Sequence, residues 1–423
     1  MGEFFKRREI QEKQGKEIIG YEIVFFNEEL NSGQGEFEKI ALANEELLFY
    51  EETLLFIPCT SKLFFSEQQM LMFPAEKVIF ELEQDVILEW DLEQQIKKYY
   101  EKNYKFSIRN FQFIPQYFKI LSYIEYVGFD VEGIGEIPKQ QKESMNNAFR
   151  IAKRLQKKCV IWGIHSKQAY DGFADLKVDL ISGKYCSKVE IDTIIKQQYL
   201  SNDLHSFMVA ISRNRVDIKE LEEKIGKNAF LTYNILQIVN APTFFERKKV
   251  KSISEAVMII GIDQLRKWFP FLLFYSQEKK ECELLIKKAF FRGFFAMELM
   301  KDKKGFSLTS AECYMMGVLS IIELIVDTEW KQIIDSLEIS CELKYALTNE
   351  EEKSHKLYVF LLAYEEENWH LVQQLAKELM IEEESVKRGY IHALYETNKV
   401  WKMLTSEYQK NDKLKEHIED LFY

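Results

Sequence analysis

The hydrophobic pattern of the chain changes near residue 190, and this change most constrains the fold. Before it, short β-favouring runs alternate with helical segments such as 37–50, 88–100 and 141–155. Units of about 20–30 residues favour parallel strands joined by crossover helices, and six or seven of them favour a closed β/α barrel of the TIM type. Strands are predicted at 21–26, 54–57, 78–82, 105–109, 126–131 and 158–162.

The first two runs of the chain predict a different connection. Residues 4–10 and 17–26 are β-favouring and flank Gln14 and Gly15. Two such runs around a short turn are typical of a hairpin, so one strand of the barrel should run antiparallel to its neighbour.

After residue 190 the strand signals stop and the apolar residues recur at helical spacing. Helices are predicted at 217–225, 229–239, 254–261, 264–275, 281–300, 310–327 and 383–404. Asp217 and Ser310 are the residue types that cap helix starts. The predicted fold class is therefore α/β followed by all-α, with domains at 1–190 and 191–423.

Composition narrows the classes of partner. The chain has 423 residues, 57 of them basic and 68 acidic, for a net charge of −11. A surface this acidic repels phosphate backbones, so we expect no nucleic-acid partner. The six scattered cysteines form no CxxC pair, which favours a reducing compartment over a disulfide framework.

No segment resembles a signal peptide or a membrane span. Residues 1–20 are charged, and the longest apolar run, at 268–275, is far shorter than the roughly 20 residues that cross a bilayer. We therefore expect a cytoplasmic protein with no membrane partner.

Two acidic residues interrupt apolar strands in the first half. Glu22 lies in Gly-Tyr-Glu-Ile-Val at 20–24, and Glu81 lies in Val-Ile-Phe-Glu-Leu at 78–82. Barrels of this type place their sites at the strand ends, so these carboxylates are candidate site residues.

The same segments resemble the EAL domain, a cyclic di-GMP phosphodiesterase barrel. The resemblance includes Phe-Lys-Arg-Arg-Glu-Ile at 5–10, Gly-Tyr-Glu-Ile-Val in place of the Glu-Ala-Leu signature, Val-Ile-Phe-Glu at 78–81 and Ser-Gly-Lys-Tyr-Cys-Ser-Lys at 182–188. In the second half, Leu-Thr-Tyr-Asn-Ile-Leu-Gln-Ile-Val-Asn-Ala at 231–241 and Ile-Ser-Glu-Ala-Val at 253–257 resemble the HDOD domain. The chain thus resembles the bacterial EAL–HDOD signalling family, which implies an EAL-like barrel and an HDOD-like helical domain.

The resemblance also implies a site that binds divalent metal ions through oxygen ligands. Glu22 and Glu81 correspond to two of these ligands. Other family positions differ here: Phe26 replaces an arginine, Pro58 an asparagine, Arg109 and Asn110 paired aspartates, Gly128 a lysine, Trp162 and His165 glutamates, and Ser182 a glutamine.

Arg109 would put a permanent cation where the metal ion belongs, because a guanidinium keeps its charge. We therefore interpret one set of residues as a vestigial pocket in which Glu22 and Arg109 pair, and we expect no catalytic residue, metal ion or cofactor. The set is Glu22, Glu81, Arg109, Asn110 and His165.

The helical half offers no metal dyad either. None of the six histidines precedes an aspartate, and no two are spaced i, i+4. A metal-dependent HD phosphohydrolase would need such ligands.

We accordingly expect no enzyme but a scaffold whose helical domain binds other signalling proteins. Dimerisation would suit EAL barrels, although the sequence does not show it. Cyclic di-GMP binding is disfavoured because Phe26 removes a phosphate partner. Two alternatives stay open, namely a cyclic di-GMP phosphodiesterase with unusual ligands around Glu22 and Glu81, and a receptor that binds the dinucleotide without cleaving it.

Overall fold

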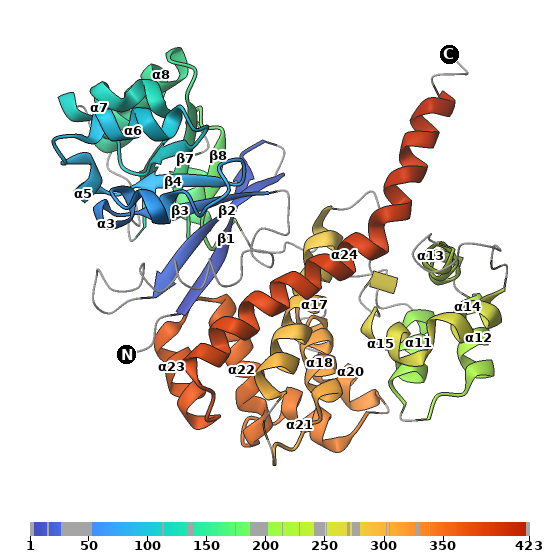
Figure 1. The fold of residues 1–423 in the computed structure, drawn as a ribbon. Helices are drawn as coiled ribbons and strands as arrows, with labels where there is room; N and C mark the ends of the chain where they lie inside the picture. Colours follow the sequence, from blue (N-terminus) through green and yellow to red (C-terminus); the bar gives the residue numbers. More distant parts are fainter. Residues whose placement is uncertain are drawn as a thin grey trace. The chain divides into compact units, whose positions relative to one another are not determined.

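The computed structural model divides the chain into two compact units, Met1–Lys188 and Val189–Tyr423 (Figure 1). It describes residues 4–14, 17–26, 53–111, 114–132, 139–173, 175–186, 202–213, 215–227, 229–240, 250, 252–268, 271–272, 280–301, 303, 305–325, 330–337 and 339–419. The helix predicted at 37–50, Gly15 and the ends of two family motifs (187–188 and 241) lie outside these residues.

The first unit is a closed eight-stranded barrel in which the strands follow one another in chain order. The strands are β1 (Phe4–Glu12), β2 (Ile18–Phe26), β3 (Leu54–Cys59), β4 (Val78–Leu82), β5 (Lys105–Ile108), β6 (Ile124–Asp130), β7 (Lys158–Trp162) and β8 (Leu180–Ser182). Strand β1 pairs antiparallel with β2 and with β8, whereas all other neighbours are parallel. The predicted barrel and its antiparallel entry hairpin are confirmed.

Short helices connect the parallel strands. They are α3 (Ser61–Phe64), α4 (Glu67–Met70), α5 (Gln84–Ile87), α6 (Leu92–Tyr100), α7 (Pro115–Ile120), η1 (Leu121–Tyr123), α8 (Lys139–Arg154) and α9 (Lys167–Gly172). The amphipathic helices predicted at 88–100 and 141–155 correspond to α6 and α8.

Large side chains fill the barrel interior. Phe56 lies edge-on to Tyr126 at 5.0 Å and to Trp162 at 5.6 Å between ring centroids. The same buried cluster includes Ile10, Ile79, Val160 and Leu180. Rings packed in this way bury large apolar areas, so the barrel is a solid core and its polar chemistry lies at the strand ends.

In the second unit, every regular element among the described residues is a helix, so the predicted fold class is confirmed. Its helices are α11 (Asn202–Ser212), α12 (Ile218–Lys227), α13 (Ala229–Val239), α14 (Ile253–Ile260), α15 (Ile262–Lys267), α17 (Lys280–Met300), α18 (Ser310–Leu319), α19 (Ile322–Ile325), α20 (Trp330–Ser336), α21 (Cys341–Thr348), α22 (Lys353–Glu365), α23 (Trp369–Glu378) and α24 (Glu383–Glu419).

The two predicted helix caps have different outcomes. Asp217 accepts a hydrogen bond from the Lys219 amide at 2.9 Å, as expected for a cap. Ser310 is not the cap of α18; Thr309 is, and it forms a reciprocal capping box with Glu312. Both Thr309 and Ser310 can cap, but only Thr309 stands three residues before a glutamate that reaches back.

Helices α17 and α18 cross in close contact at two glycines, one from each helix. A Cβ atom on Gly317 would lie 2.4 Å from the backbone of Arg292 and Gly293, and one on Gly293 would lie 2.9 Å from the ring of Tyr314. The helices therefore approach at backbone contact, which requires hydrogen at both positions.

Among the described residues, no helix combines the length and apolar character needed to span a bilayer.

We predict that Gly317→Ala destabilises the helical unit by about 1–3 kcal/mol, because the added methyl group forces two backbones apart. The matched control is Gly389→Ala in α24, where the new Cβ meets only side chains at 3.5 Å or more. That change should be neutral or stabilise by about 0.5–1 kcal/mol through helix propensity. Urea denaturation of the full chain measures both, and equal effects would contradict the close crossing.

Candidate functional site

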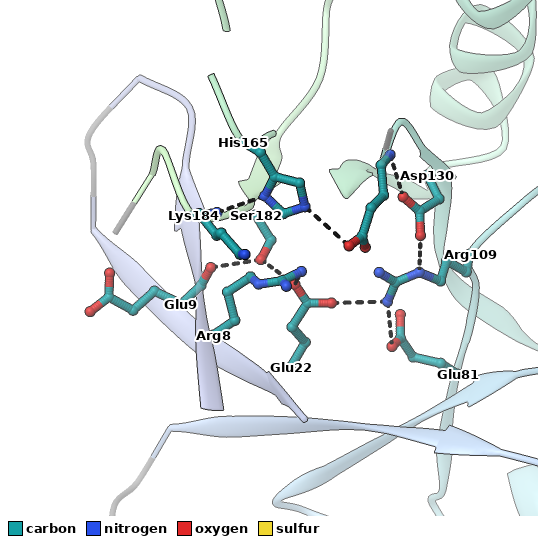
Figure 2. Close-up of polar contacts among 10 residues, drawn as sticks. Arg8, Glu9, Glu22, Glu81, Arg109, Asp130, His165, Ser182 and Lys184 are labelled. Carbon is teal, nitrogen blue, oxygen red and sulfur yellow. Dashed lines mark hydrogen bonds and ion pairs between the residues drawn. The ribbon is translucent and has the colours of Figure 1, made fainter. Parts of the chain in front are cut away.

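Glu22 occupies the centre of a polar cluster at the end of the barrel where β4, β5, β6 and β8 finish, here called the barrel mouth (Figure 2). Its side chain is fully buried. The β1–β2 register places Arg8 opposite Glu22, and Arg8 Nη1 donates to Glu22 Oε1 at 3.1 Å. The Ser182 hydroxyl lies 2.7 Å from the same oxygen and 2.8 Å from the carbonyl oxygen of Glu9.

Arg109, which directly follows β5, joins three carboxylates from three strands. Its Nη1 donates to Glu22 Oε2 at 2.9 Å and to Glu81 Oε2 at 3.3 Å, while its Nε donates to Asp130 Oδ2 at 2.6 Å. Burial alone would lower the pKa of Arg109, but the three carboxylates outweigh it and raise that pKa. The predicted pairing of Glu22 with Arg109 is confirmed.

Trp162 lies beneath the Arg109 guanidinium. The guanidinium carbon is 5.1 Å from the centre of the indole, within range of a cation–π interaction. A Cβ atom on Gly128 would lie 2.7 Å from Trp162 Nε1 and 2.8 Å from the Val160 carbonyl oxygen. The indole thus requires glycine at position 128, so the two departures from the family pattern are physically linked.

Glu81 differs electrostatically from Glu22. It is almost fully buried, and its Oε1 has no hydrogen-bond partner within the part of the chain that is described. Burial raises the pKa of Glu81 to about 8, although Arg109 opposes this rise. The guanidinium group of Arg109 lies next to this side chain and to Glu22, and that of Arg8 lies next to Glu22, which gives the buried carboxyl groups positive partners.

The rim of the mouth contains the remaining predicted residues. The Asp130 amide donates to Asn110 Oδ1 at 2.9 Å, which holds Asp130 toward Arg109. The Lys184 amide donates to His165 Nδ1 at 3.2 Å, and His165 Nε2 lies 3.3 Å from Glu132 Oε1. The contact with His165 lowers the pKa of Glu132 to about 2.

The structure brings all five sequence-predicted residues to one end of the barrel. Three of them, Glu22, Glu81 and Arg109, form one network, whereas Asn110 and His165 support it from the rim. Sequence reasoning missed Arg8 and Asp130. Asp130 interrupts the apolar run predicted as a strand at 126–131, which is the signal that identified Glu22 and Glu81.

A divalent metal ion does not fit this arrangement. Such an ion needs several free oxygen ligands at about 2.0–2.6 Å. Here Arg109 already binds one oxygen of each of the three nearest carboxylates. The described residues also contain no group of three His, Cys, Asp or Glu side chains arranged to hold a metal.

The fold and site together define a β/α barrel with a buried ionic cluster at its mouth, joined to a helical unit. The HDOD domain family matches residues 199–355 of that unit. The chain therefore contains an HDOD domain, and this domain with the closed barrel before it agrees with the predicted EAL–HDOD organisation.

Two curated proteins are similar to the chain. The cyclic di-GMP phosphodiesterase CdgJ of Vibrio cholerae is 22% identical over 307 residues, covering 72% of this chain and 69% of CdgJ. The Bacillus subtilis protein YuxH is 26% identical over 236 residues, covering 54% of each chain. The chain thus spans about half of YuxH.

Solved structures give weaker matches. The match to the EAL domain of Mycobacterium smegmatis DcpA covers 44% of this chain and 92% of the DcpA chain. The two are 14% identical, and the TM-score is 0.37. The match to an EAL domain protein from Listeria monocytogenes covers 44% of this chain and 87% of the Listeria chain. The two are 15% identical, and the TM-score is 0.35. The description of the barrel therefore rests on its own strand pairing.

The comparison with CdgJ corrects one expectation. We expected the chain not to be an enzyme, yet a protein similar to most of it is named a cyclic di-GMP phosphodiesterase. The expectation relied on counting metal ligands in one cavity. That count describes which ions the cavity holds in this arrangement, but it does not decide whether the chain has an activity.

We predict that Glu81 makes stability depend on pH. The unfolded side chain loses its proton near pH 4.3, whereas the folded one keeps it to about pH 8. Between these values the native state holds the extra proton, so the free energy of unfolding falls as pH rises, by up to about 1.4 kcal/mol per unit. Glu81→Gln should remove this fall.

Urea denaturation at pH 5.5, 6.5 and 7.5 measures the effect. The matched control is Glu67→Gln, which changes an exposed carboxylate of the same unit and should keep the wild-type slope. An unchanged slope in Glu81→Gln would show that Glu81 is ionised in the folded chain.

Proposed function

We propose that the chain is a cyclic di-GMP phosphodiesterase of the EAL–HDOD type. The similarity to CdgJ carries this proposal, because it extends over 307 residues, about twice the length of the HDOD match. The barrel mouth, where such folds place their active sites, contains an ionic cluster rather than a plain surface.

The site contributes a group suited to a phosphodiester. Among the described residues, Arg109 Nη2 has no hydrogen-bond partner, and the side chain is 22% exposed. Figure 2 shows the Arg109 guanidinium facing Glu22, with one of its nitrogens outside the dashed contacts. Nη2 can donate a charge-assisted hydrogen bond to one oxygen of a phosphodiester, while Nε and Nη1 stay bound to the carboxylates.

The reaction requires a proton for the leaving group. Hydrolysis of one phosphodiester bond joins the oxygen of water to phosphorus and breaks the bond from phosphorus to the ribose oxygen, giving a linear dinucleotide. The leaving oxygen gains a proton as the attacking water loses one. Burial keeps Glu81 protonated at neutral pH, which supports a role in holding a proton next to Arg109.

We predict that the full chain converts cyclic di-GMP to the linear dinucleotide, and that Glu22→Gln lowers the rate by at least about 100-fold. Removing the Glu22 charge releases Arg8 and Arg109 from their shared anion, which disturbs the geometry on which the site depends. Chromatography of the nucleotides after incubation with Mg²⁺, with Mn²⁺ and with a chelator measures the product.

The matched control is again Glu67→Gln, which makes the same chemical change at an exposed carboxylate that pairs with Lys98 and Lys102 and should retain wild-type turnover. Circular dichroism of both variants checks that they are folded. No linear dinucleotide from the wild-type chain under all three conditions would refute the phosphodiesterase. Saturable heat in calorimetry without product would instead support a receptor.

Binding of other signalling proteins by the HDOD domain, and dimerisation through the barrel, stay predictions. Affinity purification of the intact chain tests the first and analytical ultracentrifugation tests the second.

A further inference from the structure

We propose that Arg109 is a built-in cation that takes the place of a divalent metal ion at the barrel mouth. The proposal goes beyond the proposed function, because it concerns which cation the carboxylates hold and not which substrate they act on. Its test below uses no nucleotide.

The carboxylates that could bind a metal ion already bind the guanidinium of Arg109. Oxygens of Glu22, Glu81 and Asp130 converge from β2, β4 and β6 on one guanidinium, at 2.9, 3.3 and 2.6 Å. A metal ion held between the same three side chains would occupy the place of the guanidinium. The ion and the guanidinium therefore compete directly for one position.

Two features hold the guanidinium in place. Trp162 packs against it from below, and Asp130 fixes its Nε from the side. The Asp130 carboxylate is itself held by the Glu132 amide, which donates to its Oδ1 at 2.8 Å. For a metal ion to enter, Arg109 would have to leave three carboxylates and an indole at once.

The charge at the mouth also opposes a metal ion. Arg8 and Arg109 already bring two positive charges to Glu22. A divalent ion next to them would be repelled by both guanidinium groups at short range. Because a guanidinium keeps its charge at every ordinary pH, this repulsion persists.

The test is Mn²⁺ binding to the full chain, measured by electron paramagnetic resonance of free Mn²⁺ at pH 7. Arg109→Asn removes the cation and supplies an amide oxygen, so it should bind one Mn²⁺ on the order of 100-fold more tightly than the wild type. Arg109→Lys is the matched control: it keeps the charge and should bind like the wild type.

A double variant distinguishes Mn²⁺ binding at the gained site from weak Mn²⁺ binding elsewhere on this acidic chain. Glu22→Gln added to Arg109→Asn should abolish the gained site. The gained site should also raise the thermal unfolding midpoint of Arg109→Asn by roughly 5 °C at saturating Mn²⁺, without the same shift in the wild type.

The wild-type chain gives a measurement that needs no arginine variant to fold. Its Mn²⁺ binding should equal that of Glu81→Gln, because Arg109 already holds the site oxygens. A wild-type Mn²⁺ site that Glu81→Gln removes would overturn the proposal, as would a folded Arg109→Asn that gains no site. Neither result depends on whether the chain hydrolyses cyclic di-GMP.

Discussion

The buried carboxylate of Glu22 needs positive partners, and the barrel mouth is arranged around that need. A buried ion that loses one partner costs roughly 3–5 kcal/mol, which is a large part of the stability of a domain. Arg8 meets the need from β1, and it can do so only because the entry hairpin is antiparallel and places it opposite Glu22. Arg109 meets it from the end of β5 and extends the network to β4 and β6. The need of Glu22 for positive partners thus explains why the pairing of the strands and the geometry of the site depend on each other.

Much of the barrel could be predicted from the sequence, because most of its strands are short runs rich in β-branched and aromatic residues. The runs at 78–82 and 158–162 have the bounds of β4 and β7. Strand β8 has only three residues, too few to form a pattern. The pairing of Glu22 with Arg109 was predictable because a charge in an apolar strand needs a counter-charge. The contact of Trp162 with Gly128 was not, because it places the indole against the backbone of a neighbouring strand whose register the sequence does not state.

The helical unit shows the opposite difficulty. Helix α13 was predicted with its observed bounds, whereas α22 was missed. Seven of the thirteen residues of α22 are buried, and they lie around the helix rather than on one face. Amphipathic periodicity, the main helix signal, disappears when a helix is surrounded in this way. The segment predicted as one helix at 310–327 breaks at Ser320, whose hydroxyl accepts from the buried Arg292. Tertiary contacts, and not local preference, set these elements.

The similarity to CdgJ bears on activity, whereas the chemistry of the mouth bears on which cation the carboxylates hold. The two are compatible if the positive charge near the substrate can come from a side chain instead of a metal ion. A phosphodiester needs positive charge near its oxygens as the bond breaks, and general physical chemistry does not require that the carrier be a metal ion. A bound divalent metal ion supplies two positive charges, but it dissociates when its concentration in solution falls. Arg109 supplies one charge that neither pH nor chelation removes, and the Trp162–Gly128 contact keeps it in position. The replaced positions around Glu22 therefore form one coherent arrangement, in which the carboxylates hold a cation that the chain itself encodes.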